Sequence, residues 1–319
     1  MNEPTGPVRC SGAEHQPLIA IVGPTAVGKT ALALSLAGRF AVEVVSADSR
    51  QVYRGMDIGT AKPAMAERLR VPHHLLDLVE PDEPFTLAQY QRLAYRVIDD
   101  ILSRGRLPLL VGGTGLYVRA VLQGLRIPEV EPNPGLRQEL LQQAERDGHL
   151  ALHARLRSLD PVAAERIDAR NVRRVIRAME VCLALGGPIS EAQTAEAPPY
   201  RVLRIGLALG REPLYRRIDE RIDVMLEAGL VSEVKGLLER GYDYRLPSMS
   251  GLGYRQIGLY LQGQVTLTEA VALIRRDTRR FVRQQGTWFR ADDPTIAWFD
   301  VSGGLDDAVA TRIEGFLNG

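Results

Sequence analysis

The sequence predicts an α/β protein: a parallel sheet flanked by helices, with an all-helical domain inserted into it. Three observations lead to this prediction. A glycine-rich loop follows the first apolar run, short apolar runs then alternate with helical patterns, and one long stretch that is helical throughout interrupts the alternation.

The first apolar run, residues 18–22, predicts a buried strand, and helical spacing begins at Ala31. Between them lies a complete G-x-x-x-x-G-K-T phosphate loop made of Gly23, Pro24, Thr25, Ala26, Val27, Gly28, Lys29 and Thr30. In such a loop the backbone N–H groups and the helix N-terminus bind phosphate, the lysine adds a charge, and the hydroxyl ligates phosphate-bound Mg²⁺. The predicted fold is therefore P-loop NTPase-like, and the ligand is a nucleotide or another diphosphate.

Four more short apolar runs predict the other strands, at residues 42–46, 107–111, 203–209 and 296–301. A helix is expected between the second and third strands, because Thr86 and Gln89 form a capping box and Gly105 follows the last helical residue. Strand, helix and strand in this order indicate a parallel sheet.

A proline-rich segment at residues 127–135 ends the alternation, and helical patterns dominate from there to about residue 185. We therefore expect a flexible leader at residues 1–17, a first part of the P-loop core at 18–124, an inserted helical domain at 125–197, and the rest of the core with C-terminal helices at 198–319.

The bulk composition excludes several classes of protein. The formal net charge is +1, so the chain as a whole is not a strongly basic nucleic-acid binder. Its two cysteines, Cys10 and Cys182, lie far apart, and no apolar run is long enough to cross a membrane. We expect a cytoplasmic, monomeric protein without a disulfide or a signal peptide.

Asp48 follows the second predicted strand and is the first candidate for catalysis. Ligands of open parallel sheets bind beyond the carboxyl ends of the strands, so this side chain should face the phosphate loop. There it could bind Mg²⁺ or accept a proton, although a plain turn-capping role remains equally open.

The third strand ends in Gly112, Gly113, Thr114 and Gly115. Three glycines in four residues indicate that a ligand or a neighbouring element approaches the backbone closely. The strand lacks the terminal acidic residue typical of ATPases, which argues against an NTP-hydrolysing motor but leaves a kinase open.

Two sets of arginines recur at helical spacing. The first comprises Arg170, Arg173, Arg174 and Arg177, and the second comprises Arg275, Arg276, Arg279, Arg280 and Arg283. Arginine pairs with phosphate, and Trp288 and Phe289 after the second set could stack on bases, so RNA or polyphosphate is the predicted partner. The alternative is a solvated basic face neutralised by acidic residues such as Asp277.

Several motifs together resemble the bacterial tRNA dimethylallyltransferases. They are the phosphate loop, residues 48–63 (DSRQVYRGMDIGTAKP), 71–77 (VPHHLLD), 112–117 (GGTGLY), 173–181 (RRVIRAMEV), 253–256 (GYRQ) and 287–290 (TWFR). The resemblance spans residues 18 to about 290 in order. It implies transfer of a dimethylallyl group from dimethylallyl diphosphate to N6 of adenosine 37, just 3′ of the tRNA anticodon.

The resemblance also implies roles for residues. Lys29, the loop amides and Mg²⁺, held by Thr30 through the diphosphate, would stabilise the leaving group, assisted by Arg221, with Arg211 as the alternative. Asp48 would deprotonate the attacking amine of an adenine flipped out of the anticodon arm. The expected tRNA contacts are Asp48, Ser49, Arg50, Gln51, Thr114, Arg137, Arg173, Arg174, Val175, Ile176 and Arg177.

Three other functions remain as alternatives. A P-loop small-molecule kinase would use ATP as the donor. An adenylate isopentenyltransferase would prenylate a free mononucleotide, which needs neither arginine set. A non-catalytic RNA chaperone would leave the phosphate loop and Asp48 without a role.

Overall fold

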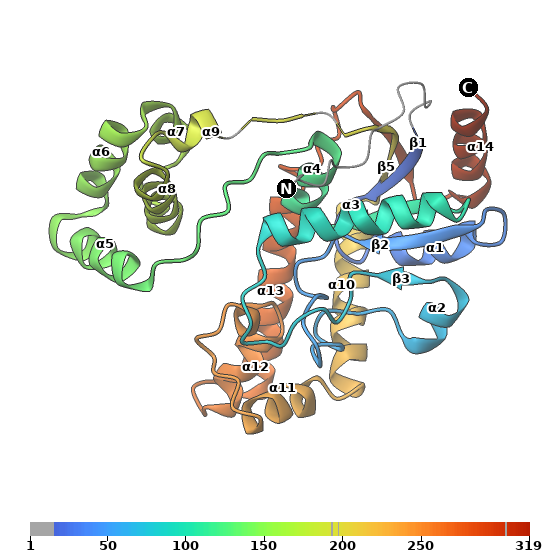
Figure 1. Ribbon diagram of the computed structural model, residues 1–319. Helices are drawn as coiled ribbons and strands as arrows, with labels where there is room; N and C mark the ends of the chain where they lie inside the picture. The colour runs from blue at the N-terminus through green and yellow to red at the C-terminus, as the bar shows by residue number, and fades with distance from the viewer. Residues whose placement is uncertain (1–15, 193, 197, 304) are drawn as a thin grey trace, which may run out of the picture. The chain divides into compact units, whose positions relative to one another are not determined.

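The computed structural model describes residues 16–319 except 193, 197 and 304 (Figure 1). Most of the expected leader, including Cys10, lies outside the described residues, whereas Gln16 and Pro17 already belong to the first strand. The chain divides into two compact units. Residues up to 119 together with 199–319 form the core unit, and residues 120–198 form the helical unit.

The described part of the core unit contains a six-stranded parallel sheet, so the predicted α/β fold is confirmed. The strand order is β3-β2-β4-β1-β5-β6. The strands are β1 (Gln16–Val22), β2 (Val42–Ser46), β3 (His73–His74), β4 (Leu107–Gly112), β5 (Tyr200–Ala208) and β6 (Ile296–Asp300). The sequence predicted all of them except β3, whose two histidines carry no apolar pattern.

Strand β4 lies between β1 and β2, with Val22 paired to Gly112 and Ser46 paired to Val111. The carboxyl ends of all three strands therefore meet at one edge of the sheet. Neighbouring strands lie about 4.8 Å apart, so the segments that follow β1 and β2 start about 10 Å from each other.

Helices cover both faces of this sheet. The chain passes from β1 through α1 to β2 and returns through α3 to β4, and right-handed crossovers in opposite directions place α1 and α3 on opposite faces. The core-unit helices are α1 (Lys29–Leu36), α2 (Met65–Arg70), α3 (Leu87–Ser103), α4 (Gly115–Gln123, which runs on past residue 119), α10 (Arg211–Glu227), α11 (Leu230–Glu239), α12 (Tyr254–Leu261), α13 (Leu267–Gln285) and α14 (Leu305–Asn318), with a short 3₁₀ helix at Ser248–Ser250.

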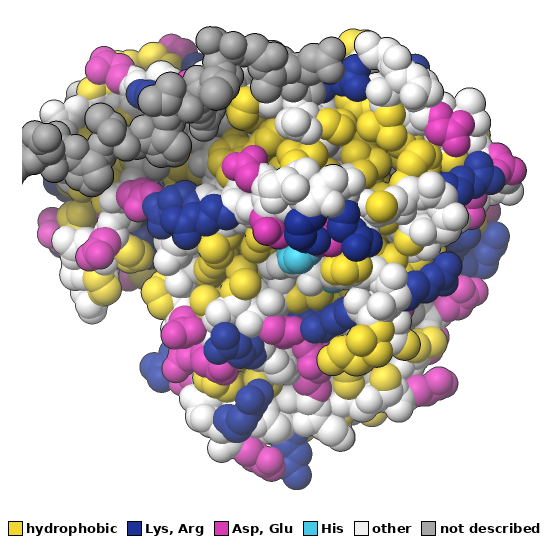
Figure 2. Space-filling view, turned by 45° about the vertical axis from the view of Figure 1, so that its right-hand side comes forward, with side chains coloured by type: hydrophobic (Ala, Val, Ile, Leu, Met, Phe, Trp, Pro, Cys, Tyr) yellow, Lys and Arg dark blue, Asp and Glu magenta, His cyan; other side chains and the backbone are white. Residues whose placement is uncertain are grey.

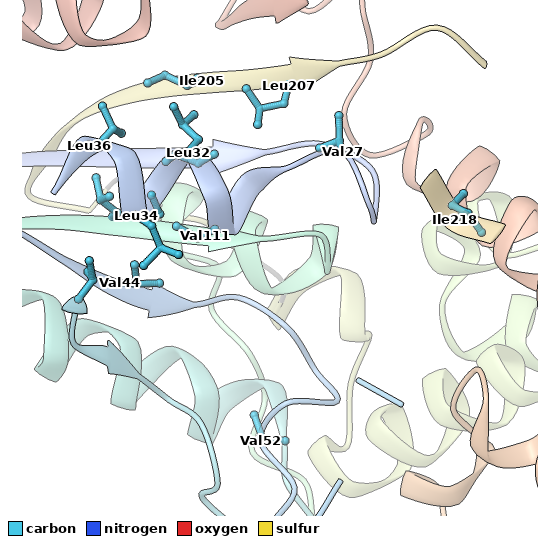
Figure 3. Packing of buried hydrophobic residues seen from close by; sticks show 14 of the residues in the cluster. Val27, Leu32, Leu34, Leu36, Val44, Val52, Val111, Ile205, Leu207 and Ile218 are labelled. Atoms are coloured by element: carbon cyan, nitrogen blue, oxygen red, sulfur yellow. The ribbon is translucent and has the colours of Figure 1, made fainter. Parts of the chain in front are cut away.

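The main hydrophobic core joins α1 to one face of the sheet (Figure 3). Leu32 and Leu36 of α1 pack with the strands, where alternate residues such as Ile205 and Leu207 point to this face. The expected start of α3 is confirmed, because Thr86 Oγ1 accepts from the Gln89 amide at 3.2 Å.

The helical unit consists of α5 (Pro134–Asp147), α6 (His149–Leu159), α7 (Pro161–Arg166), α8 (Val172–Leu185) and α9 (Ile189–Ala192). Its own core includes Leu140, Leu152 and Met179. Buried Asp160 caps α7 by accepting from the Ala163 amide at 2.8 Å, and it also accepts from the Ser190 amide at 2.8 Å. The unit is thus held together by its own hydrophobic core and by hydrogen bonds to buried Asp160.

Candidate functional site

The phosphate loop curls at the carboxyl end of β1. Ala26 and Gly28 adopt left-handed conformations with φ of 64° and 113°. A side chain at Gly23 would lie 2.6 Å from the Leu207 carbonyl oxygen, so glycine is required there. The Lys29 ammonium donates to the carbonyl oxygens of Gly23 at 3.0 Å and Pro24 at 2.7 Å.

Burial lowers the pKa of Lys29 to about 8. The negative charge of Asp48 opposes this shift, and the positive charge of Arg221 adds to it. These interactions bring together in space three residues that the sequence assigned to catalysis from separate parts of the chain.

Two arginines of α10 contact the phosphate loop. Arg221 donates to the Thr25 hydroxyl at 3.2 Å, and Arg217 donates to the Val27 carbonyl at 3.1 Å. Arg211, the alternative to Arg221, is exposed at the first residue of the helix. Arg217 was not predicted from the sequence, although its position one helical turn before Arg221 was a usable signal.

Asp48 follows β2 and is partly buried. Its Oδ1 accepts from the Arg50 amide at 2.8 Å, so it caps a turn as the plainer alternative supposed. The same carboxylate also interacts electrostatically with Lys29 and Arg221. The turn-capping role is therefore observed, and a role of Asp48 in proton transfer or Mg²⁺ binding stays a prediction.

The glycine-rich end of β4 is crowded by protein. A Cβ added at Gly112 would lie 2.2 Å from the Ala47 carbonyl oxygen, one at Gly113 would lie 2.3 Å from Nε2 of Gln285, and one at Gly115 would lie 2.2 Å from the Trp288 ring. The sequence predicted that either a ligand or a neighbouring element approaches these glycines closely. Neighbouring elements do so in this structure.

Thr114 in the same segment is bonded to the turn that carries Asp48. Its hydroxyl accepts from the Ser49 amide at 3.1 Å and donates to the Ser49 hydroxyl at 3.4 Å. Thr114 and Ser49, two of the expected tRNA contacts, thus lie side by side.

Arg50 and Gln51 are anchored to other loops. Arg50 donates to the Pro247 carbonyl at 2.5 Å, and Gln51 donates to the Thr60 carbonyl at 3.3 Å and the Ala61 carbonyl at 3.2 Å. In this structure their side chains therefore order the segments around Asp48.

The rest of the segment 48–63 is held by partly buried Glu233 and by buried Lys62. Glu233 accepts from the amides of Asp57 at 2.9 Å, Ile58 at 2.7 Å and Gly59 at 3.1 Å, and from the Tyr254 hydroxyl at 2.6 Å. Buried Lys62 pairs with Asp57 and Asp77, at 2.5 and 2.6 Å. Much of this segment therefore has a structural role.

Two stacked tyrosines, Tyr90 and Tyr117, lie near Asp48. The rings of Tyr90 and Tyr117 stack with centroids 3.9 Å apart, and the Tyr90 hydroxyl donates to the Ser46 carbonyl at 3.1 Å. Burial raises the pKa of both phenols, and the charge of Asp48 contributes to each shift. Both therefore remain neutral near pH 7.

In the first arginine set, Arg173 and Arg174 of α8 are exposed, and no pairing partner of theirs is found among the described residues. Val175 and Ile176 are buried in the core of the helical unit. Helical periodicity turns these two side chains inward. The expected contact of residues 173–177 with tRNA stays a prediction.

Arg137 and Arg177 share one partner, buried Glu180. Arg137 donates to its two oxygens at 2.9 and 2.8 Å, and Arg177 donates at 2.5 Å. Burial alone would raise the pKa of Glu180, but these hydrogen bonds and one from the Asn133 amide lower it to about 2. Both arginine side chains remain about two-fifths exposed.

The second arginine set is largely neutralised. Arg275 pairs with Asp223 at 2.5 Å, and Arg279 pairs with Asp219 at 2.5 Å, both across to α10. Arg276 pairs with Asp277, as the alternative of a neutralised face supposed. Figure 2 shows acidic and basic side chains interspersed on the face of the molecule that it presents.

Two findings concern the described residues as a whole. They contain no cluster of three or more His, Cys, Asp or Glu side chains able to hold a metal ion. Nor does any helix among them combine the length and the apolar character needed to cross a bilayer.

Comparison with known proteins identifies the family. Residues 51–292 match the IPP transferase family, and residues 16–76 match the isopentenyl transferase family. The tRNA dimethylallyltransferase of Roseiflexus castenholzii is 60% identical over 86% of this chain and 90% of its own length. That of Thermomicrobium roseum is 53% identical over 91% and 88%.

Solved structures agree with this match. The tRNA isopentenylpyrophosphate transferase of Bacillus halodurans aligns with a TM-score of 0.70 and 44% identity, over 95% of this chain and 96% of that one. A eukaryotic dimethylallyltransferase acting on tRNA aligns with a TM-score of 0.79 and 26% identity, over 95% and 79%. The P-loop core with its helical insertion, read together with these matches, makes the chain a member of the IPP transferase family.

Proposed function

We propose that the protein transfers the dimethylallyl group of dimethylallyl diphosphate to N6 of adenosine 37 in tRNA. The products are N6-(dimethylallyl)adenosine and diphosphate. The observation that carries the proposal is that the phosphate loop, which Arg221 contacts at Thr25, and the turn that carries Asp48 follow strands β1 and β2 at the same edge of the sheet. Relatives named tRNA dimethylallyltransferase support the same reaction.

The donor half of the site is the phosphate loop. As the allylic C1–O bond breaks, negative charge grows on the departing diphosphate. The loop amides, the Lys29 ammonium and the Arg221 guanidinium are positioned to stabilise that charge. Lys29 would exchange its bonds to the Gly23 and Pro24 carbonyls for bonds to phosphate oxygens.

The acceptor half is the turn after β2. The N6 amine of adenine is a weak nucleophile because its lone pair is delocalised into the ring. Asp48 accepts a proton from this amine as it attacks C1, a role worth about 10²–10⁴-fold in rate. An adenine stacked in an anticodon arm cannot reach a partly buried carboxylate at the end of a strand, so the base is flipped out of the stack.

The residues present fit a Mg²⁺ ion carried by the diphosphate. Thr30 lies in the first turn of α1 and is partly buried, and no acidic cage surrounds it among the described residues. This donor set suits Mg²⁺, which takes few protein ligands and completes its shell with phosphate oxygens and water. When bound, the ion would neutralise the charge of the leaving group.

The helical unit supplies the proposed tRNA contacts outside the active site. Exposed Arg173 and Arg174, together with Arg137 and Arg177 held by Glu180, form a group of cations suited to a phosphate backbone. Such contacts position the RNA without reading its sequence.

The direct test is incubation with radiolabelled dimethylallyl diphosphate, Mg²⁺ and unmodified tRNA, followed by nucleoside analysis of the tRNA digest. The proposal predicts label in N6-(dimethylallyl)adenosine. Phosphorylation of a small molecule by ATP with unlabelled tRNA would instead indicate a kinase. Comparable turnover on AMP would indicate an adenylate isopentenyltransferase.

A further inference from the structure

Gln285, at the end of α13, is a buried polar residue that none of the roles above uses. Its side chain is 3% exposed although the flanking residues Gln284 and Gly286 are exposed. Its Oε1 accepts from the Thr25 amide at 2.9 Å, and its Nε2 donates to the Gly113 carbonyl at 2.9 Å. One amide group therefore bonds the phosphate loop to the segment after β4.

This bridge continues to the acceptor half of the site. Gly113 is followed by Thr114, whose hydroxyl accepts from the Ser49 amide, and Ser49 is next to Asp48. Thr25, which starts the bridge, also accepts a hydrogen bond from Arg221. A continuous chain of contacts thus runs from the diphosphate-binding loop to the proposed base.

The glycines after β4 allow this amide to approach the backbone closely. A Cβ at Gly113 would lie 2.3 Å from Nε2 of Gln285, and one at Gly115 would overlap Trp288, three residues further along the same chain segment. The end of α13 is therefore fitted against the end of β4. The contact between Gly115 and Trp288 does not involve the hydrogen bonds of Gln285 and is a separate sign of close docking.

We infer that Gln285 is a positioning residue that sets the separation between the diphosphate-binding loop and Asp48. Direct attack on an allylic carbon requires the amine and C1 at a defined distance, and a misplacement of 1 Å can cost about 10²-fold in rate. The amide suits this task because it offers one donor and one acceptor to two backbone segments. The inference rests on the proposed prenyl transfer.

The test is Gln285→Met, which nearly preserves the volume and removes both hydrogen bonds. We expect the single-turnover rate of transfer at saturating substrates to fall about 10- to 100-fold. The dissociation constants of radiolabelled dimethylallyl diphosphate and of tRNA, each measured alone, should change less than about twofold. Gln284→Met, the same change at the exposed neighbour, should leave the rate within about twofold of wild type.

A second variant keeps the test informative if Gln285→Met does not fold. Gly113→Ala places a methyl group where Nε2 of Gln285 lies and leaves the glutamine in the chain. Its rate should fall as in Gln285→Met, and the double variant should be no slower than either single one, because both break the same bridge.

Several results would overturn the inference. One is an unchanged transfer rate in a folded Gln285→Met protein, and another is a loss of donor affinity as large as the loss of rate. Independent, additive losses in the double variant would also contradict it. Failure of the wild-type protein to modify tRNA would count against the proposed function instead, so the two failures are distinguishable.

Discussion

Lys29 connects the electrostatics of the site to a measurable pH dependence. Burial lowers its pKa to about 8, although the negative charge of Asp48 acts to raise it. The ammonium is therefore charged below this pH and loses its proton as pH rises through it. Because the diphosphate binds the charged form, donor affinity should be highest below pH 8 and fall by up to about tenfold per pH unit above it.

Equilibrium binding of dimethylallyl diphosphate between pH 6 and 10 checks this prediction. The Lys29→Arg variant is the control, since arginine stays charged throughout this range. Its binding curve should be flat above pH 8. An inflection at the same pH in the variant would assign the titration to another group.

The contacts around β4 could be predicted only in part from single residues. The run Gly112, Gly113 and Gly115 predicted a close approach without identifying its source. Gln285 supplied no signal that set it apart from its neighbour Gln284, because glutamines near a helix end are ordinary. The amide bridge arises only when α13 packs beside β4, which is a tertiary contact.

At the scale of elements, Glu233 of α11 stabilises the loop that follows the Asp48 turn. It accepts three backbone amides and the Tyr254 hydroxyl. Glu233→Ala leaves these donors without their partner, so we expect a loss of about 2 kcal/mol in the free energy of unfolding. Urea denaturation measures it.

Glu239→Ala on the same helix is the matched control. Glu239 is exposed and pairs with Lys235 at 3.8 Å, so its removal should cost less than about 0.5 kcal/mol. Equal losses in the two variants would refute a special role for the Glu233 contacts.

Helix α8 carries the proposed tRNA contact of the helical unit. Arg173→Ala should weaken tRNA binding and reduce the slope of log K against log salt by about one, because one phosphate contact is lost. Filter binding over a salt series measures this slope. The control is Arg39→Ala. Arg39 is an exposed arginine that follows the end of α1 and pairs with Asp307, and its removal should leave the slope unchanged. A wild-type slope for Arg173→Ala would remove that residue from the interface.

Among the elements, strands and long helices were predictable and short polar ones were not. Buried parallel strands are continuous apolar runs, and α3 carries its own caps, so both were recognised. Helix α2 has no buried residue, and β3 consists of two histidines, one of them bound to Glu43 at 2.6 Å. The formation of β3 depends on β2 and Glu43, which are distant in sequence.

For the whole molecule, acid stability should depend on carboxylates with lowered pKa values. The pKa of Glu180 is about 2 in the folded protein, against 4.5 for an unperturbed glutamate side chain. Its stabilisation is therefore present above pH 4.5 and is lost as pH falls toward 2. We discount its size to about 1–2 kcal/mol, because its arginine partners are partly exposed.

Urea unfolding at pH 5.5 and pH 3 tests this contribution. The loss of stability between these pH values should be smaller in Glu180→Gln than in wild type, because glutamine does not titrate. An identical loss in the two proteins would show that Glu180 does not contribute to the acid transition.

The order of the strands explains why the sequence alone could assemble most of the site. The predicted phosphate loop, Asp48 turn and glycine-rich segment end three adjacent strands, so the sheet brings them together without further information. Arg217 and Gln285 come from helices, and their placement depends on packing that strand patterns do not encode.

The central claim is that Asp48 accepts the proton of the attacking amine, and Asp48→Asn tests it most directly. Asparagine retains an oxygen for the Arg50 amide but cannot act as the base. We expect a single-turnover transfer rate lowered by at least about 10²-fold, with the dissociation constant of tRNA nearly unchanged. A rate close to wild type, or a loss of tRNA affinity equal to the loss of rate, would contradict it.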